Sequence, residues 1–195
     1  MSWRDQFAKP AGPMGWLVGQ AMAMKNGDRS MWVFSLLDLK PSDKVLEIGF
    51  GSGTDILRAS KVAKFVAGVD HSELMVRQAT KRNAAAIKEG RVELKHGTAG
   101  KLPYPDEQFD RVFAINSAQF WKDTAKTMTE LGRVLKPGGL VVLAIQPRGK
   151  NATEETARQA GVGISKALTG AGFRDIHTEM HDMKPVPTIC VLGRK

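Results

Sequence analysis

One acidic residue and three alternating glycines lie close together in the segment VLEIGFGSGTD, residues 45–55. The acid is Glu47, and the glycines are Gly49, Gly51 and Gly53. Glycine accepts a positive φ and has no Cβ, so a glycine-rich backbone can turn tightly and lie directly against a ligand. Such a turn after the first strand of an open α/β sheet lies at the edge where ligands bind. The segment is therefore a candidate binding loop.

The order of residues in this loop indicates the class of ligand. A dinucleotide site has the pattern G-x-G-x-x-G and places a pyrophosphate on the following helix. Here the third position of that pattern is Thr54, and Glu47 would repel a pyrophosphate but attract an ammonium group. Asp70 follows Gly49 by about 20 residues, a spacing at which an acid can accept hydrogen bonds from ribose hydroxyls. Asp70 could instead cap the next helix, but together these features favour an amino acid joined to a nucleoside.

Strands and helices alternate after residue 40 and would position these residues. We expect strands at 44–50, 64–70, 91–97, 109–116, 140–146, 174–180 and 187–193, and helices at 54–63, 72–90, 121–135 and 152–170. This alternation predicts an α/β fold, a doubly wound and mostly parallel seven-stranded sheet with helices on both faces. The last two strands have no helix between them, so they can pair only as an antiparallel hairpin. We therefore expect an antiparallel last strand and a mostly parallel sheet with an antiparallel edge.

Residues 1–40 precede the first strand and differ in character. Their sequence predicts two apolar helices, divided at Asn26-Gly27, that form an N-terminal helical cap. We expect this cap to belong to the same single domain as residues 41–195, which form the Rossmann-like core. The apolar stretch from Met14 to Met24 could form a mobile lid over a substrate. A helix fixed on the sheet is the alternative, because methionine-rich stripes more often belong to a core.

Composition limits the possible functions. The chain has 29 Lys and Arg against 20 Asp and Glu, a net charge of +9. This charge could attract nucleic acid, an anionic membrane surface or an acidic small molecule, but the basic residues are dispersed and favour a solvated surface. The single cysteine, Cys190, excludes an internal disulfide and agrees with a cytoplasmic location. No apolar stretch reaches transmembrane length, and the N-terminus does not resemble a secretory signal.

Four segments carry a resemblance to a known family: VLEIGFGSG, VAGVDHSELMV, GTAGKLPYPDEQFDRVFAINS and LGRVLKPGGLVVL. Over residues 43–145 the chain resembles the class I S-adenosylmethionine-dependent methyltransferases, closest to the branch of the ubiquinone and menaquinone biosynthesis methyltransferases. The resemblance implies a Rossmann-like fold and S-adenosyl-L-methionine as the cofactor. It gives almost no information about the substrate.

The same resemblance implies which residues contact the cofactor. These are Glu47, Gly49, Phe50, Gly51, Gly53, Asp70, His71, Met75, Thr98, Ala99 and Asn116. Glu47 and the glycine loop would hold the methionine part, Asp70 the ribose, and His71 and Met75 the adenine. Thr98 stands where related proteins often have an acid that binds the adenine amino group. Asn116 would lie near the methyl group or the amino acid portion.

The methyl acceptor is less well indicated. Trp16, Phe120 and Trp121 could line a substrate pocket, although the two loop aromatics could equally pack against the N-terminal helices. We assign no general base and expect no metal, since His177 and His181 lack a clear third ligand. We expect a small-molecule or lipid-headgroup acceptor, with peripheral membrane contact possible and no stable nucleic acid partner. The alternatives are a non-catalytic binding module and a methyltransferase acting on nucleic acid or protein.

Overall fold

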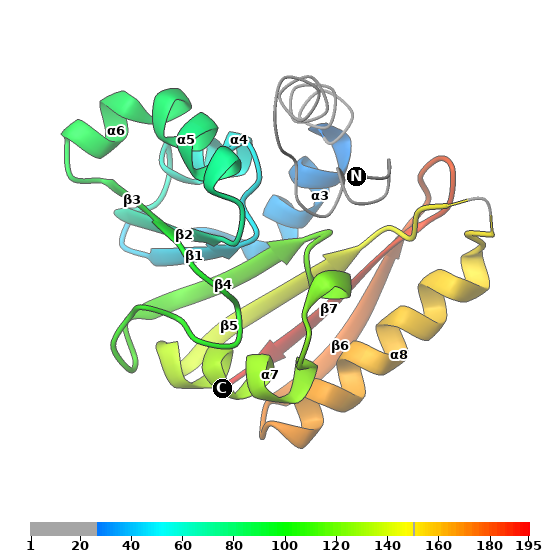
Figure 1. The fold of residues 1–195 in the computed structure, drawn as a ribbon. Coiled ribbons are helices and arrows are strands. Elements are labelled where there is room, and N and C mark those ends of the chain that lie inside the picture. Colours follow the sequence, from blue (N-terminus) through cyan, green and yellow to red (C-terminus); the bar gives the residue numbers. More distant parts are fainter. Residues whose placement is uncertain (1–26, 150) are drawn as a thin grey trace.

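A seven-stranded sheet forms the centre of the protein in the computed structural model, which describes residues 27–149 and 151–195 (Figure 1). The strands lie in the order β3-β2-β1-β4-β5-β7-β6. Their bounds are β1 (Lys44–Ile48), β2 (Phe65–Asp70), β3 (Val92–His96), β4 (Phe109–Ile115), β5 (Leu135–Ile145), β6 (Arg174–His181) and β7 (Thr188–Arg194). β7 pairs antiparallel with both of its neighbours, and the other strands run parallel. The Rossmann-like architecture expected from the sequence is confirmed.

Helices cover both faces of this sheet, as expected. They are α3 (Gly27–Leu37), α4 (Thr54–Ala59), α5 (Glu73–Arg82), α6 (Ala84–Lys88), the 3-10 turn η1 (Ala118–Phe120), α7 (Thr124–Val134) and α8 (Glu154–Gly170). α3 corresponds to the second helix predicted for the N-terminal cap. The first half of that cap, with Trp16 and the Met14–Met24 stretch, lies outside the described residues, and the domain boundary at residue 40 stays a prediction.

The last hairpin forms one edge of the sheet. β6 and β7 pair antiparallel as predicted, and the last strand, β7, lies between β5 and the edge strand β6, an order that the sequence prediction did not specify. The burial of the two strands explains this order. Thr188–Leu192 is apolar and buried, whereas most residues of β6 are exposed. A continuous apolar strand belongs inside a sheet, and a polar strand protects an edge from pairing with other chains.

Two other elements depart from the sequence prediction. The single helix expected at 72–90 is divided at Asn83, whose side-chain amide donates to the carbonyl oxygens of Gly53 and Ala79. Residues 136–139, which lie between the helix and the strand expected from the sequence, are an irregular part of β5, where the pairing with β4 shifts between Phe109–Leu135 and Arg111–Leu140.

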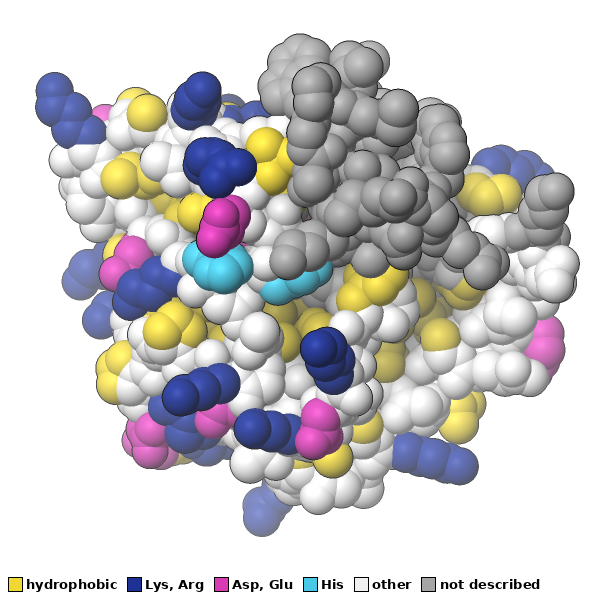
Figure 2. Space-filling view, viewed as in Figure 1, with side chains coloured by type: hydrophobic (Ala, Val, Ile, Leu, Met, Phe, Trp, Pro, Cys, Tyr) yellow, Lys and Arg dark blue, Asp and Glu magenta, His cyan; other side chains and the backbone are white. Residues whose placement is uncertain are grey.

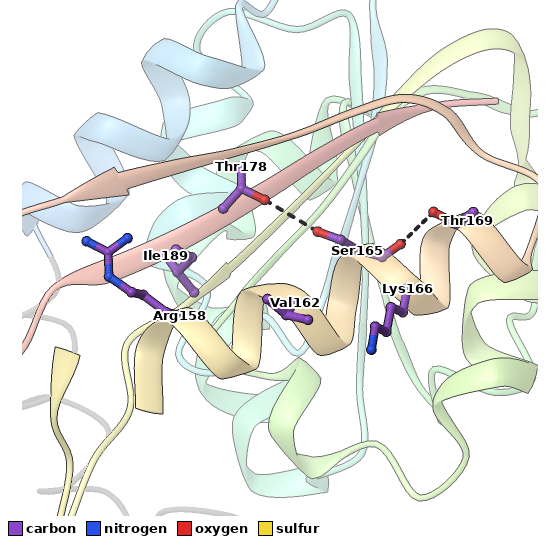
Figure 3. Close-up of a pocket in the computed structure, with 7 residues that line it drawn as sticks. All are labelled: Arg158, Val162, Ser165, Lys166, Thr169, Thr178 and Ile189. Carbon is purple, nitrogen blue, oxygen red and sulfur yellow. Dashed lines mark hydrogen bonds between the residues drawn. The ribbon is translucent and has the colours of Figure 1, made fainter. Parts of the chain in front are cut away.

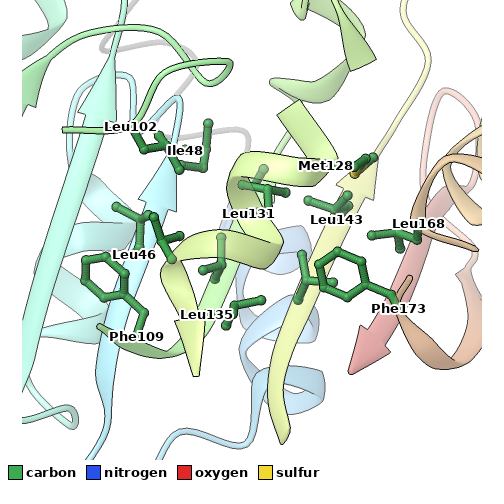
Figure 4. Packing of buried hydrophobic residues seen from close by; sticks show 14 of the residues in the cluster. Leu46, Ile48, Leu102, Phe109, Met128, Leu131, Leu135, Leu143, Leu168 and Phe173 are labelled. Atoms are coloured by element: carbon green, nitrogen blue, oxygen red, sulfur yellow. The ribbon is translucent and has the colours of Figure 1, made fainter. Parts of the chain in front are cut away.

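Alternate residues of the strands pack into two hydrophobic clusters on opposite faces of the sheet. Figure 4 shows one of them, in which Leu46 and Ile48 of β1 lie with Met128 and Leu131 of α7 and Leu168 of α8. The opposite cluster joins Val45 to residues of α3, α4, α5 and α6. Glu47 has the same parity as Val45 in β1, so its side chain points to the face covered by α3 and α4. Side chains that end β1, β2 and β4 meet where the strand order reverses, which is where open α/β sheets bind ligands.

Candidate active site

A cavity of about 800 Å³ lies at the carboxyl ends of β1, β2 and β4. It brings together most of the site residues expected from the sequence: Glu47, Gly49, Phe50, Gly51, Asp70, His71, Met75, Thr98, Ala99, Asn116, Phe120 and Trp121. Gly53 is not part of the cavity wall, and Trp16 lies outside the described residues. The cavity is within the size range of sites for small molecules and cofactors.

The three glycines of the loop have different reasons for lacking a side chain. A Cβ on Gly49 would lie 2.4 Å from Ser117 Cβ, and one on Gly53 would lie 2.6 Å from Ala79 Cβ. These two positions are therefore small because other parts of the protein pack against them. At Gly51, where φ is +52°, a Cβ would have no described atom within 4 Å. Since Gly51 borders the cavity, it is the glycine whose missing side chain leaves room for a ligand.

Asp70 at the end of β2 organises both the glycine loop and the next helix. Its Oδ2 accepts a hydrogen bond from the Gly51 N–H at 2.9 Å, and its Oδ1 accepts one from the Ser72 N–H at 2.9 Å. Ser72 in turn is the N-cap of α5 and accepts from the Met75 N–H. Asp70 therefore does not cap α5 itself; it binds the backbone of the capping residue and also borders the cavity. Burial raises the pKa of the Asp70 carboxyl group.

Glu47 is a buried acid that faces the cavity, with only 3% of its surface exposed. Its Oε2 accepts no hydrogen bond from any residue that the structure describes. Burial raises the pKa of Glu47 well above its usual value, and the nearby carboxylates of Asp55 and Asp70 raise it further. A buried carboxyl group in this state is costly unless a donor or a cation pairs with it. The arrangement therefore suits a positively charged ligand group.

Asp55 is a third acid of the cavity, and sequence reasoning gave it no role. It lies in the first turn of α4, accepts a hydrogen bond from the Ser30 hydroxyl at 2.8 Å, and forms an ion pair with Arg58. Burial raises its pKa as well. The position of Asp55 at the end of the glycine segment could have indicated that it lies near the cavity. Its hydrogen bond with Ser30 of α3 could not be predicted, because the two residues lie in different elements.

Asn116 at the end of β4 is held by a network of buried polar groups. The Gln146 N–H donates to Asn116 Oδ1 at 2.7 Å, and the Asn116 backbone has a φ of +54°. The Gln146 side chain accepts from Arg29 of α3 at 2.6 Å and donates to the Val186 carbonyl oxygen at 2.8 Å. Burial lowers the pKa of Arg29 to about 10, with Arg148 as the second cause. This network joins α3, β5 and the last hairpin to one residue of the cavity.

The far end of the cavity is formed by loops after β2 and β3. His71 and His96 both border it, and His96 Nε2 lies 3.1 Å from the His71 carbonyl oxygen. Met75 is buried there, and Thr98 forms an isolated β-bridge with Lys101. This end has the composition expected for holding a flat aromatic group, with side chains from two loops facing one another.

Several other sequence candidates lie elsewhere. Tyr104, in the segment between β3 and β4, is buried and donates to the Gly68 carbonyl oxygen at 3.4 Å. His181 stacks on Trp32 of α3 with ring centroids 5.1 Å apart, and Cys190 is buried in the core. In the described ranges, 27–149 and 151–195, no group of three or more His, Cys, Asp or Glu residues could hold a metal ion. No helix in the same ranges is long and apolar enough to cross a membrane.

A second, open concavity of about 480 Å³ lies between α8 and the last two strands. Figure 3 shows that its side chains include Arg158, Val162 and Lys166 of α8 together with Thr178 of β6. These four are exposed, and Ser165 Oγ lies within hydrogen-bond distance of Thr178 Oγ1 at 3.3 Å. This groove lacks the buried, ligand-facing acid of the first cavity, so we assign the active site to the first.

Comparison with known proteins identifies the family of the chain. The family model described as "Methyltransferase domain" matches residues 46–143. The chain is 31% identical over 181 residues to an uncharacterized methyltransferase, YdaC, of Bacillus subtilis, covering 92% of this chain and 98% of that protein. It is 32% identical over 120 residues to a demethylmenaquinone methyltransferase of Streptomyces avermitilis, covering 60% of this chain but only 49% of the relative.

A solved structure extends the comparison to a bound cofactor. Phosphoethanolamine N-methyltransferase 2 of Haemonchus contortus, in complex with S-adenosyl-L-methionine, superimposes with a TM-score of 0.66 at 26% identity. The match covers 81% of this chain and 39% of that one. The menaquinone relative belongs to the branch that the sequence resembles, and the family match spans β1 to β5. The chain therefore belongs to the class I S-adenosylmethionine-dependent methyltransferases.

Proposed function

We propose that this enzyme transfers the methyl group of S-adenosylmethionine to a small-molecule or lipid-headgroup acceptor, with the cofactor held in the 800 Å³ cavity. The observation that carries the proposal is the buried Glu47 carboxylate, whose Oε2 has no hydrogen-bond partner among the described residues. A cofactor with an ammonium group and a sulfonium would supply the positive charge that this acid lacks.

The polar atoms of the cavity fit the amino acid part of this cofactor. Glu47 offers an acceptor for the ammonium group. Asn116 offers a donor, since its Nδ2 is buried and has no partner in the described part of the chain, while its Oδ1 is occupied by Gln146. An amino acid zwitterion needs one group of each kind. Glu47 and Asn116 would then fix the methionine end of the cofactor.

We propose the contacts to the ribose and the adenine from the positions of the residues that border the cavity. Asp70 would accept hydrogen bonds from the ribose hydroxyls, since two backbone N–H groups already hold its carboxylate in place. His71, Met75, Thr98 and Ala99 would surround the adenine. Gly51 would leave the space through which the loop approaches the ligand.

The cofactor supplies a methyl group already activated by its bond to a positively charged sulfur. In the transfer, the carbon–sulfur bond breaks with its electron pair kept by sulfur, a bond forms from carbon to the acceptor atom, and an acceptor that carries a proton loses it. The protein has to hold the acceptor in line with the methyl group and keep water out. Orientation of this kind supplies roughly 7–11 kcal/mol in well-aligned reactions. We name no general base.

The acceptor end of the cavity is aromatic. Phe120 of η1 is 47% exposed and Trp121 is half-buried, and both border the cavity. The relatives described above are named for demethylmenaquinone and phosphoethanolamine, which supports a small or lipid-like acceptor here. On the face drawn in Figure 2, Lys and Arg side chains are scattered, which does not favour a nucleic acid.

Calorimetry with S-adenosylhomocysteine, S-adenosylmethionine and NAD tests the cofactor first. We expect both sulfur compounds to bind and NAD not to bind. Mass spectrometry of a panel of amines, phenols and lipid headgroups, incubated with enzyme and S-adenosylmethionine, then tests transfer. Failure to bind S-adenosylhomocysteine would contradict the proposal. Binding without transfer to any acceptor of the panel would favour the non-catalytic alternative.

A further inference from the structure

Three lysines lie on one side of the active-site cavity, and the proposed cofactor contacts use none of them. Lys101 is in the loop after β3, and Lys122 and Lys126 lie where the chain enters α7. All three border the cavity and are exposed. We call them the lysine rim.

The segments that carry the lysine rim are in contact with each other. A Cβ built on Gly100 would lie 3.8 Å from Lys126 Cδ and 3.7 Å from Thr127 Oγ1. The stem of Lys126 therefore lies against the residue that precedes Lys101. Lys122 is separated from Lys126 by the N-cap residue Asp123 and the first turn of the helix. The three ammonium groups thus belong to facing segments at one end of the same cavity.

Acidic neighbours of the lysine rim have other partners. Asp123 accepts a hydrogen bond from the backbone N–H of Lys126 at 2.9 Å as the helix cap. Glu130 accepts from the Leu102 N–H and from the Arg133 guanidinium. The ion pairs formed within the described residues include none of the three rim lysines. The charge of Lys126 contributes, after Arg133, to the lowered pKa of Glu130, but none of the three lysines is held in one of these ion pairs, so their charges are available to a ligand.

Charge is separated along the cavity. Its buried part has the acids Glu47, Asp55 and Asp70, while this exposed part of the edge has three lysines against one acid, Asp123. S-adenosylmethionine carries a net positive charge, so a basic rim does not help to attract it. A second ligand with a negative charge would be attracted by the lysine rim. It would then lie beside a positively charged methyl donor.

We propose that the methyl acceptor carries a phosphate group and that the lysine rim binds it. The proposal rests on the proposed function, since it describes the second substrate of the same cavity. Phosphate is favoured because it can be doubly charged and its several oxygens can accept from more than one lysine. The exposed ring of Phe120 lies on the same cavity and would contact the apolar part of the acceptor. A soluble phosphate ester and a phospholipid headgroup share this chemistry.

Inorganic phosphate is the first probe. It is titrated into protein saturated with S-adenosylhomocysteine, and binding is followed by calorimetry at low and high salt. The test variant is Lys101→Gln/Lys122→Gln/Lys126→Gln. The matched control is Lys61→Gln/Lys81→Gln/Lys88→Gln, which removes the same charge from exposed lysines away from the cavity. We expect phosphate affinity to fall at least about tenfold in the rim variant and to change less than about twofold in the control.

The outcomes separate this inference from the proposed function. Saturable phosphate binding that the rim variant loses and the control keeps supports the inference. Equal loss in both variants, or no saturable binding by the parent, overturns it, even where S-adenosylhomocysteine still binds. No binding of S-adenosylhomocysteine by the parent overturns the proposed function instead.

A second measurement identifies the source of the phosphate. Parent and both variants are sedimented with phosphatidylcholine vesicles that contain or lack phosphatidic acid. Sedimentation that needs phosphatidic acid and the lysine rim indicates a lipid headgroup. If the parent binds inorganic phosphate but no vesicle, the acceptor is a soluble phosphate ester.

Discussion

The Gln146 N–H donates to Asn116 Oδ1 at 2.7 Å, which fixes the orientation of the Asn116 amide at the end of β4. A backbone N–H can bind only the oxygen of an amide, so the Asn116 NH₂ group is the one left for the cavity. The structure thereby assigns a hydrogen-bond donor, and not an acceptor, to this point of the wall.

Asn116→Asp tests that assignment. The substitution keeps the shape and the oxygen that Gln146 binds, but it replaces the donor by a second, negatively charged oxygen. A ligand carboxylate at this point would lose a hydrogen bond and meet a like charge. We expect the affinity for S-adenosylhomocysteine to fall at least about tenfold, measured by calorimetry. Unchanged affinity in a folded variant would show that Asn116 does not contact the cofactor.

Glu47→Gln tests the ammonium contact. The amide has nearly the same volume as the carboxylate but no charge, so packing in the buried position should be kept. Hydrogen bonds to charged groups contribute about 1.5–3 kcal/mol, so we expect S-adenosylhomocysteine affinity to fall roughly 10- to 150-fold. Calorimetry gives the affinity, and near-native circular dichroism serves as the folding control. If the variant binds S-adenosylhomocysteine as tightly as the parent, Glu47 does not contact the cofactor.

The pH dependence of stability should follow the raised pKa of Glu47. An acid whose pKa is higher in the folded state than its usual 4.5 stabilises the folded protein fully below 4.5. That contribution is lost as the pH rises through the folded-state value. Without ligand, the parent should therefore lose stability relative to Glu47→Gln as the pH rises above 4.5. Denaturant unfolding of both proteins across this range measures the difference, and a difference independent of pH would contradict it.

Two glycine variants should separate folding from binding. Gly49 and Gly51 have φ angles of +75° and +52°, so valine is strained at either position by at least about 1–2 kcal/mol. Only at Gly49 would the added Cβ also collide with Ser117. We expect Gly49→Val to unfold at a markedly lower temperature, and Gly51→Val to fold but lose most S-adenosylhomocysteine binding. Equal thermal stability of the two variants, or intact binding by Gly51→Val, would contradict this division.

Much of the fold was predictable because each strand and helix has a local signature. The strand expected at 44–50 and the helix expected to begin at residue 72 appear in the structure as β1 and as α5 with its Ser72 cap. The order of the last two strands was not predicted, although the contrast between polar β6 and apolar β7 carries that information.

The site residues that could be predicted from the sequence are those at the ends of adjacent parallel strands. Glu47, Gly51 and Asp70 meet because β1 and β2 are neighbours, so spacing along the chain translates into position. The bonds from Ser30 to Asp55 and from Gln146 to Asn116 join elements far apart in sequence, and no local pattern encodes them. The packing of Ser117 against Gly49 and of Ala79 against Gly53 likewise joins distant segments, so the sequence could not show this second reason for a glycine at each position.

The direction of β7 determines where the chain's last residue lies. Because β7 runs opposite to the other strands, it ends beside the beginning of β5, where the Lys195 N–H donates to the Gly139 carbonyl oxygen at 3.0 Å. The residues that line the cavity lie at the opposite end of the sheet, after β1, β2 and β4, and Figure 1 marks the two ends by the arrowheads of β4 and β5 and by the C label. An affinity handle or sensor-chip tether attached after Lys195 would therefore face away from the ligands and leave their route of entry clear.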